Sequence, residues 1–166
     1  MSRAFVRESD DAKEYLPPSR PPLPAGVTNY ITPSGARRMK AELDRLLAEK
    51  QSCGAEEERR KLEARVRELQ QRIQTLVVPP APTSRDVVCF GATVKVRDSE
   101  GEQVTYRIVG IDEADPDRER ISWRSPLARA LLSHRVGEKV EFNAPSGGQQ
   151  LEILEISNDP DVPAGS

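Results

Sequence analysis

Residues 56–82 read EEERRKLEARVRELQQRIQTLVVPPAP, and this stretch decides the fold. Five aliphatic side chains recur in it at alternating spacings of four and three residues: Leu62, Val66, Leu69, Ile73 and Leu76. This spacing is typical of the seam of a coiled coil, and one helix cannot bury such a seam alone. The prolines within residues 79–82 end any helix and act as a semi-rigid spacer. The stretch therefore predicts a helix with a helical partner, followed by a break in the chain.

Residues 33–50 are expected to form the partner helix. Thr32 is a good N-cap and Pro33 suits the first helical position. Four apolar residues follow at spacings that share one helical face: Met39, Leu43, Leu46 and Leu47. Because the glycine-containing connection at residues 51–54 is short, it favours antiparallel packing. We predict an antiparallel α-helical coiled-coil hairpin over residues 32–78, although the pattern also fits a hairpin that dimerises or folds back on the rest of the chain.

The period changes from helical to strand-like after the prolines. Alternating apolar residues predict a β-hairpin over residues 92–108, and residues 121–123 suggest another short strand. Ser125 and Pro126 are expected to start a brief helix that reaches residue 132. Two more strands are expected at residues 138–142 and 150–156, around a turn at residues 145–148. Five strands with one short helix predict an α+β chain with one aliphatic core.

Composition at the two ends of the chain suggests further boundaries. Residues 1–31 are rich in proline and are expected to be an extended or disordered leader. Residues 79–88 are interpreted as a linker and residues 89–157 as the second domain. Residues 158–166 have little apolar surface to bury, so we expect a flexible tail.

The overall composition argues against several classes of function. A formal net charge of −2 gives no general attraction to nucleic acid, so direct duplex binding is a weak hypothesis. Cys53 and Cys89 lack CxxC spacing and His134 has no near Cys or His partner, so we expect reduced thiols and no metal site. No apolar run is long enough to span a membrane and the N-terminus lacks a signal core, which favours a cytoplasmic location.

Several motifs, taken in order, are similar to those of the GreA/GreB transcript-cleavage factors. The resemblance covers about residues 32–157. It begins with TPSG at residues 32–35 and Glu42-Leu43. It continues with FGATV at 90–94, YRIVG at 106–110, DEAD at 112–115 and SPLARALL at 125–132.

The resemblance implies a coiled-coil arm that enters the secondary channel of bacterial RNA polymerase. The second domain is then FKBP-like, meaning similar to the FK506-binding proteins, and it grips the rim of that channel. The chain is not expected to be an enzyme or to hold a cofactor of its own, because the Mg²⁺ belongs to the polymerase. We expect a monomer that contacts nascent RNA only indirectly.

The predicted hairpin tip differs from that of the cleavage factors. Their tip carries a GDxSENA-like stretch whose paired acids help to position Mg²⁺ and water, because a divalent ion prefers hard oxygen ligands. Residues 48–55 contain no such pair, and the arm is shorter than in those factors. Glu56, Glu57 and Glu58 are weak catalytic candidates, and as acids in a first helical turn they are better explained by the helix dipole.

Two other groups are candidates for contact with the polymerase. Residues 33–78 carry eleven basic and eight acidic side chains, against nine and twelve in residues 89–156. The basic residues of the arm either meet an acidic channel lining or, as the pattern favours, form a solvated face: Arg59, Arg60, Lys61, Arg65 and Arg67. In the second domain, exposed loop residues are the expected contacts: Asp112, Glu113, Asp115, Ser125, Pro126 and Arg129. Arg129 is the strongest candidate, since arginine is enriched at interfaces and this one has no evident folding role.

Four functional hypotheses follow from the sequence. The leading one is a Gre-like factor that occupies the secondary channel and modulates elongation or initiation without stimulating cleavage. The second is a cleavage factor that uses Glu56–Glu58, and the third is an anti-Gre or Rnk-like competitor. Prolyl isomerase activity, the fourth, is doubtful because such sites need an aromatic-lined pocket, and the core is expected to claim some of the four available rings: Phe90, Tyr106, Trp123 and Phe142.

Overall fold

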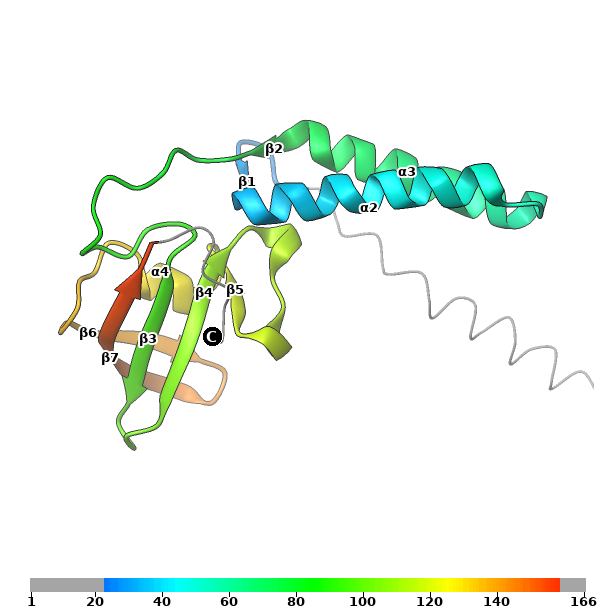
Figure 1. Cartoon of the computed structure of the whole chain (residues 1–166). Helices are drawn as coiled ribbons and strands as arrows, with labels where there is room; N and C mark the ends of the chain where they lie inside the picture. The colour runs from blue at the N-terminus through cyan, green and yellow to red at the C-terminus, as the bar shows by residue number, and fades with distance from the viewer. Residues whose placement is uncertain (1–22, 159–166) are drawn as a thin grey trace, which may run out of the picture.

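The computed structural model describes residues 23–158 and shows an α+β chain in two parts. Helices α2 (Pro33–Ser52) and α3 (Glu56–Thr75) lie side by side and project away from a curled β-sheet domain (Figure 1). Neither these helices nor any other helix among residues 23–158 is long and apolar enough to cross a membrane.

Helix α2 starts where the sequence predicts and ends two residues later. The Thr32 hydroxyl accepts a hydrogen bond from the Gly35 N–H at 3.1 Å, and Pro33 occupies the first turn, as expected of an N-cap and its neighbour. Gln51 and Ser52, predicted to lie in the connection, belong to the helix. The link between α2 and α3 is therefore only residues 53–55.

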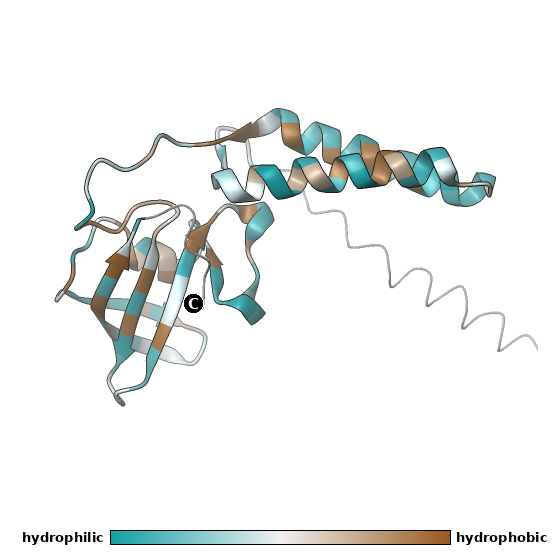
Figure 2. Cartoon of the chain, viewed as in Figure 1, coloured by the Kyte–Doolittle hydropathy of each residue, from teal (hydrophilic) through white to brown (hydrophobic). Residues whose placement is uncertain are grey.

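The two helices pack through aliphatic side chains flanked by ion pairs. Leu46 of α2 and Val66 of α3 are 2% and 6% exposed. Lys50 pairs with Glu63 at 3.3 Å and Arg65 with Glu42 at 3.5 Å across the helix pair. Since such exposed pairs contribute at most about 1 kcal/mol, burial of the apolar residues is the main stabilising term. Figure 2 shows hydrophobic positions (brown) along both helices, interspersed with hydrophilic positions (teal).

The end of α3 corrects the predicted seam. Leu76, expected to be helical, lies in strand β2 (Leu76–Val77), which pairs in parallel with β1 (Asn29–Tyr30). The Ile31 N–H also donates to the Val77 carbonyl at 3.0 Å. The β-branched Val77 and Val78 and the proline that follows favour extended backbone, which ends the helix early. This two-stranded sheet was not predicted, and it fixes part of the expected leader beside the second helix.

Five strands form the sheet of the second domain in the order β5-β4-β3-β7-β6. Their bounds are Thr93–Asp98 for β3, Gln103–Val109 for β4, Arg120–Ser122 for β5, Lys139–Ala144 for β6 and Gly147–Ser157 for β7. The expected antiparallel domain needs one correction, because β5 pairs with β4 in parallel. Two short 3₁₀ helices, η1 (Ile111–Glu113) and η2 (Pro116–Arg118), return the chain to the end of the sheet at which a parallel strand must start.

The turn between β6 and β7 is tighter than predicted. Gly147 and Gly148 belong to β7, and Ala144 pairs directly with Gly147. Only Pro145 and Ser146 remain in the turn, so the chain reverses in two residues. The positive φ of Gly147, +121°, is a conformation that glycine adopts without strain.

The core lies between the sheet and α4 (Pro126–Leu131). Alternate residues of each strand face it, and Ala128 and Leu131 of α4 are fully buried against them. The remaining buried members come from the strands and their flanking loops: Val88, Ala92, Val94, Val96, Ile108, Val140, Leu151 and Ile153. The four aromatic rings named above all pack against this cluster, as expected of a core that claims them.

Candidate functional site

The junction between the helix pair and the sheet domain is built around one carboxylate. Oε2 of Glu113, in η1, accepts hydrogen bonds from the Thr32 N–H at 3.0 Å and from the Gly110 N–H at 2.9 Å. Oε1 accepts a hydrogen bond from the Thr32 hydroxyl and lies 3.5 Å from a guanidinium nitrogen of Arg38. The Glu113 side chain is 3% exposed. The residue that caps α2 is therefore bonded directly to the loop that follows β4.

Two glycines make this close approach possible. A Cβ atom at Gly35 would overlap the Glu113 carboxylate, and one at Gly110 would overlap the Tyr30 carbonyl. Because one collision involves the buried, hydrogen-bonded Glu113 carboxylate and the other a backbone carbonyl, a larger residue cannot be accommodated without moving the helix pair from the sheet. The glycine of the TPSG motif thus has a packing role at the junction.

Asp112, the residue before Glu113, reaches the other helix. Its carboxylate lies 3.5 Å from a guanidinium nitrogen of Arg72 in α3 and accepts a hydrogen bond from the Asn29 amide at 3.3 Å. The same amide nitrogen donates to the Thr75 hydroxyl at 3.1 Å. We call Asp112, Glu113 and these bonded partners the clasp. One short turn of chain thereby holds the start of α2, the end of α3 and strand β1.

Aromatic packing adds to the clasp. The Tyr30 ring, in β1, lies 5.7 Å from the Phe90 ring and 5.4 Å from the Trp123 ring, the latter edge-on. Tilted and edge-to-face pairs at such distances contribute roughly 0.5–1.5 kcal/mol each beyond the burial of area. Polar and apolar contacts therefore fix the same junction.

These contacts correct the expectation that the loop from residue 112 to residue 117 is exposed. Glu113 is buried, and Asp112 is partly buried against both helices. Asp115 is also engaged, because its carboxylate accepts the Asp117 N–H at 3.2 Å and pairs with Arg118 at 3.6 Å. The sequence analysis missed Asn29, Arg38 and Arg72 as partners, since nothing local signals contacts with residues that lie 83, 75 and 40 positions away.

The α4 segment keeps its expected exposed face. Ser125 is the N-cap and accepts the Ala128 N–H at 3.2 Å, so its hydroxyl is occupied within the helix. Pro126 and Arg129 are exposed. Arg129 makes no side-chain hydrogen bond or ion pair with any residue in the described part of the chain. Of the residues predicted around α4, these two are available to a partner.

The three glutamates near the tip are engaged with neighbouring groups on the arm. Glu56 pairs with Arg60 at 2.8 Å and Glu57 with Lys61 at 3.7 Å, one helical turn along, while Glu58 lies near the Cys53 thiol. Among residues 23–158, no group of three His, Cys, Asp or Glu residues could hold a metal ion. The three acids are therefore placed as first-turn residues that interact with the helix N-terminus and with neighbouring cations.

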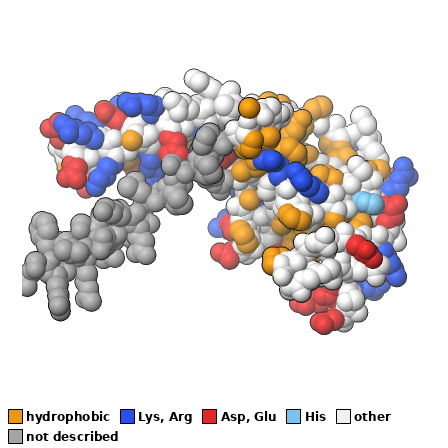
Figure 3. Space-filling model, turned by 180° about the vertical axis from the view of Figure 1, so that it is seen from behind, with side chains coloured by type: hydrophobic (Ala, Val, Ile, Leu, Met, Phe, Trp, Pro, Cys, Tyr) orange, Lys and Arg blue, Asp and Glu red, His pale blue; other side chains and the backbone are white. Residues whose placement is uncertain are grey.

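The basic residues of the arm do not form one uninterrupted face. Arg60 and Lys61 are paired as above, and Arg65 pairs with Glu42. The Arg59 guanidinium donates to the Cys53 carbonyl at 2.9 Å, and Arg67 is exposed. Figure 3 shows blue and red side chains intermixed over the arm. This mixture agrees with the solvated-face interpretation.

Comparison with known proteins places these features in a family. The model for "Transcription elongation factor, GreA/GreB, C-term" matches residues 82–158. The chain is 35% identical over 151 residues to transcription elongation factor GreB of Neisseria meningitidis serogroup A, which covers 77% of this chain and 93% of the relative. The chain belongs to the GreA/GreB family.

Other members of the GreA/GreB family match similar shares of the chain. GreB of Pseudomonas aeruginosa is 37% identical over 163 residues, covering 85% of this chain and 96% of that protein. Among solved structures, GreA/GreB from Nitrosomonas europaea is 28% identical, covers 77% of this chain and 98% of its own, and gives a TM-score of 0.41. The family match at residues 82–158 includes η1 and α4, so it contains both the domain side of the clasp and the exposed face at Arg129.

Replacing Glu113 with alanine should loosen the junction. Two backbone N–H groups and the Thr32 hydroxyl would lose their acceptor, and each such buried loss costs about 1–3 kcal/mol. We expect the free energy of unfolding to fall by at least about 3 kcal/mol in urea titrations, with faster amide hydrogen exchange at Thr32 and Gly110. Asp117→Ala, at an exposed neighbour, is the control. Unchanged exchange at both amides in Glu113→Ala would show that the clasp does not form.

Proposed function

We propose that this protein is a transcription factor that binds bacterial RNA polymerase, inserts the helix pair into the secondary channel and modulates elongation. The observation that carries the proposal is a projecting pair of 20-residue helices anchored at its base by the clasp. At 1.5 Å per residue, each helix is about 30 Å long. An arm of this kind reaches into a channel effectively only when its base is held at a fixed angle to the domain that docks outside.

The second domain supplies the docking part of the proposal. We assign it an FKBP-like fold, with the exposed face of α4 against the rim of the channel and the helix pair as the coiled-coil arm. Arg129 and Pro126 project from this face, and Leu131 on the opposite side of the helix is fully buried. A short helix anchored in the core is a rigid platform for an arginine contact, and arginine is enriched in the energetically important parts of interfaces.

The residues at the tip support the part of the proposal that concerns modulation without stimulated transcript cleavage. A Mg²⁺ ion belonging to the polymerase would need a pair of free carboxylates from the arm. In this chain, two of the three tip glutamates are paired with cations on their own helix, and residues 53–55 carry no acid. The helix pair therefore fills space and contributes charge, while the reaction chemistry remains with the polymerase. Contact with nascent RNA is indirect, inside the elongation complex.

The same observation favours a second candidate function, that of a competitor. A channel-binding arm without tip acids would exclude a cleavage factor from the same site and supply none of its activity, as an anti-Gre or Rnk-like inhibitor does. A competition assay separates the two. Displacement of a cleavage-competent GreB from polymerase, with loss of cleavage and no effect on elongation alone, would identify the competitor.

The first test of the proposal is the Arg129→Ala substitution. Its exposed side chain makes no hydrogen bond or ion pair among residues 23–158, so we expect unchanged stability and an affinity for core polymerase about fivefold to tenfold weaker, as for a residue of moderate importance at an interface. Fluorescence anisotropy with labelled protein measures the dissociation constant. Arg135→Ala, another exposed arginine of this domain, serves as the matched control. Equal affinity of wild type and Arg129→Ala would remove α4 from the interface.

A second test changes Glu56, Glu57 and Glu58 together to alanine. If these acids act only on their own helix, the triple variant should bind polymerase normally and leave RNA cleavage in a stalled, backtracked complex at the level without factor, as the wild type does. Helix stability should fall by roughly 1 kcal/mol through lost dipole and i,i+4 interactions. Cleavage stimulated by the wild type and abolished in the variant would instead establish the glutamates as catalytic acids.

A further inference from the structure

A row of three polar side chains crosses the sheet on the face opposite α4. Thr93 of β3 is the register partner of Arg107 in β4, and Arg107 is the register partner of Arg120 in β5. Directly paired residues on neighbouring strands point to the same face. Their neighbours in sequence, Val94 and Ile108, face the core, so the row faces away from it. A hydroxyl and two guanidinium groups are thus aligned side by side.

Part of this row is buried without a hydrogen-bond partner. Thr93 is 9% exposed, and its hydroxyl oxygen is buried with no partner among the described residues. The Nε atom of Arg120 is also buried and has no hydrogen-bond partner among the described residues. A buried polar group without a partner costs about 1–3 kcal/mol, which is why such groups in native proteins usually mark a site for an ion, water or ligand.

Three arginines act on the Arg120 guanidinium. Arg38, Arg107 and Arg118 all lie near enough to act on it, and burial together with these like charges lowers the pKa of the Arg120 guanidinium, against an opposing effect of Glu113. Glu113 is already bonded in the clasp, and Asp115 pairs with Arg118. These two carboxylates are therefore committed to other partners, and a further anion would relieve the repulsion that Arg120 meets from the neighbouring arginines.

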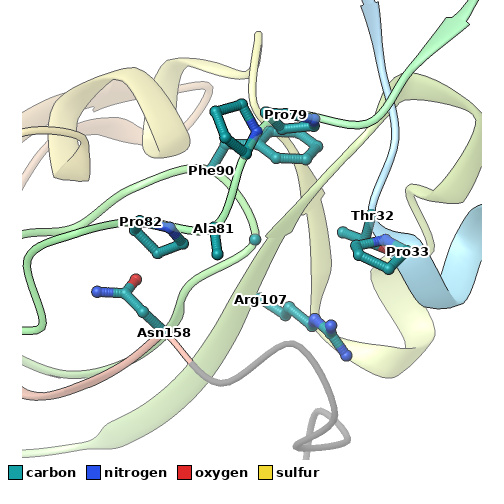
Figure 4. Close-up of a pocket in the computed structure, with 10 residues that line it drawn as sticks. Thr32, Pro33, Pro79, Ala81, Pro82, Phe90, Arg107 and Asn158 are labelled. Carbon is teal, nitrogen blue, oxygen red and sulfur yellow. The ribbon is translucent and has the colours of Figure 1, made fainter.

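The space beside the row is small. A cavity of about 90 Å³ is lined by Arg107, Thr32, Phe90, Gly91, Asn158 and the prolines of residues 79–82. Figure 4 shows Arg107 between Asn158 and the start of α2 at Thr32 and Pro33. Cavities for drug-sized ligands are about 300–1,000 Å³, so this one is the size for a few waters or a compact ion.

We propose that the Thr93–Arg107–Arg120 row is a binding site for a phosphate-type oxyanion. The planar fork of arginine matches the oxygen spacing of phosphate, and a hydroxyl donates readily to a third oxygen. A doubly charged tetrahedral anion provides more acceptors than a carboxylate does, so it satisfies Arg120 and Thr93 together. The site lies beside the clasp, at the base of the arm, and the inference does not depend on polymerase binding.

Titration of the full chain with sodium phosphate, at an ionic strength held constant with sodium chloride, tests the site. Arginine Nε–Hε resonances report directly on the groups involved. We expect saturable shifts of the Arg120 and Arg107 resonances. With Arg107 as the reporter in every variant, the apparent affinity should be at least tenfold weaker in Arg120→Gln and about threefold weaker in Thr93→Val. Arg97→Gln is the matched control, because Arg97 lies on the same sheet face but is paired with Glu152 at 2.7 Å. It should bind as the wild type does.

Two further measurements make the result decisive. Arg120→Lys keeps the charge and should fold even if Arg120→Gln does not, and it should still bind phosphate more weakly than wild type. Adenosine diphosphate distinguishes the source of the phosphate group: tighter binding than that of inorganic phosphate assigns a nucleotide, and equal or weaker binding assigns the free ion. Shifts that do not saturate, that chloride alone reproduces, or that Arg97→Gln loses to the same extent would overturn the site.

Discussion

The Glu113 carboxylate is the interaction on which the arrangement of the two parts depends. An ionised side chain that is 3% exposed is costly to bury unless hydrogen bonds replace its lost water, and here three donors and one arginine do so. Two of those donors belong to Thr32, the residue that also caps α2. If the first turn of the arm separated from the loop after β4, the Glu113 carboxylate would lose its hydrogen-bond donors at Thr32 or become exposed to solvent. Gly35 and Gly110 leave the space for this contact.

The contacts at the base of the arm fix its orientation relative to the sheet domain. The short strands β1 and β2 close the pair at its base, and Asp112 ties the end of α3 to the same turn that holds the start of α2. The helix pair therefore has one fixed orientation relative to the exposed face of α4. This defined position supports our proposal that the arm acts by occupying space in the polymerase.

Local signals in the sequence predicted much of this fold, and contacts distant in sequence account for the corrections. The caps at Thr32 and Ser125, the helical period, and the alternation along β3 and β4 each depend on residues a few positions apart, so they could be read directly. The parallel pairing of β5 and the β1–β2 sheet join segments whose partners no local pattern identifies. Glu113 illustrates the difference most clearly. Within DEAD it resembles an exposed acidic loop residue, and only the folded chain brings Thr32 to it. Arg129, by contrast, remains exposed as predicted, and its role in binding remains a prediction.

The most direct test of a rigidly held arm uses the two native cysteines. Cys53 lies at the tip and Cys89 in the sheet domain, and both are free and partly exposed. Spin labels on these residues allow double electron–electron resonance to measure the distribution of distances between arm and domain in solution, with a Cys53→Ser sample to exclude pairs between molecules. A clasped arm predicts one narrow distribution that broadens in Glu113→Ala. A broad or two-peaked distribution in the native chain would contradict the account.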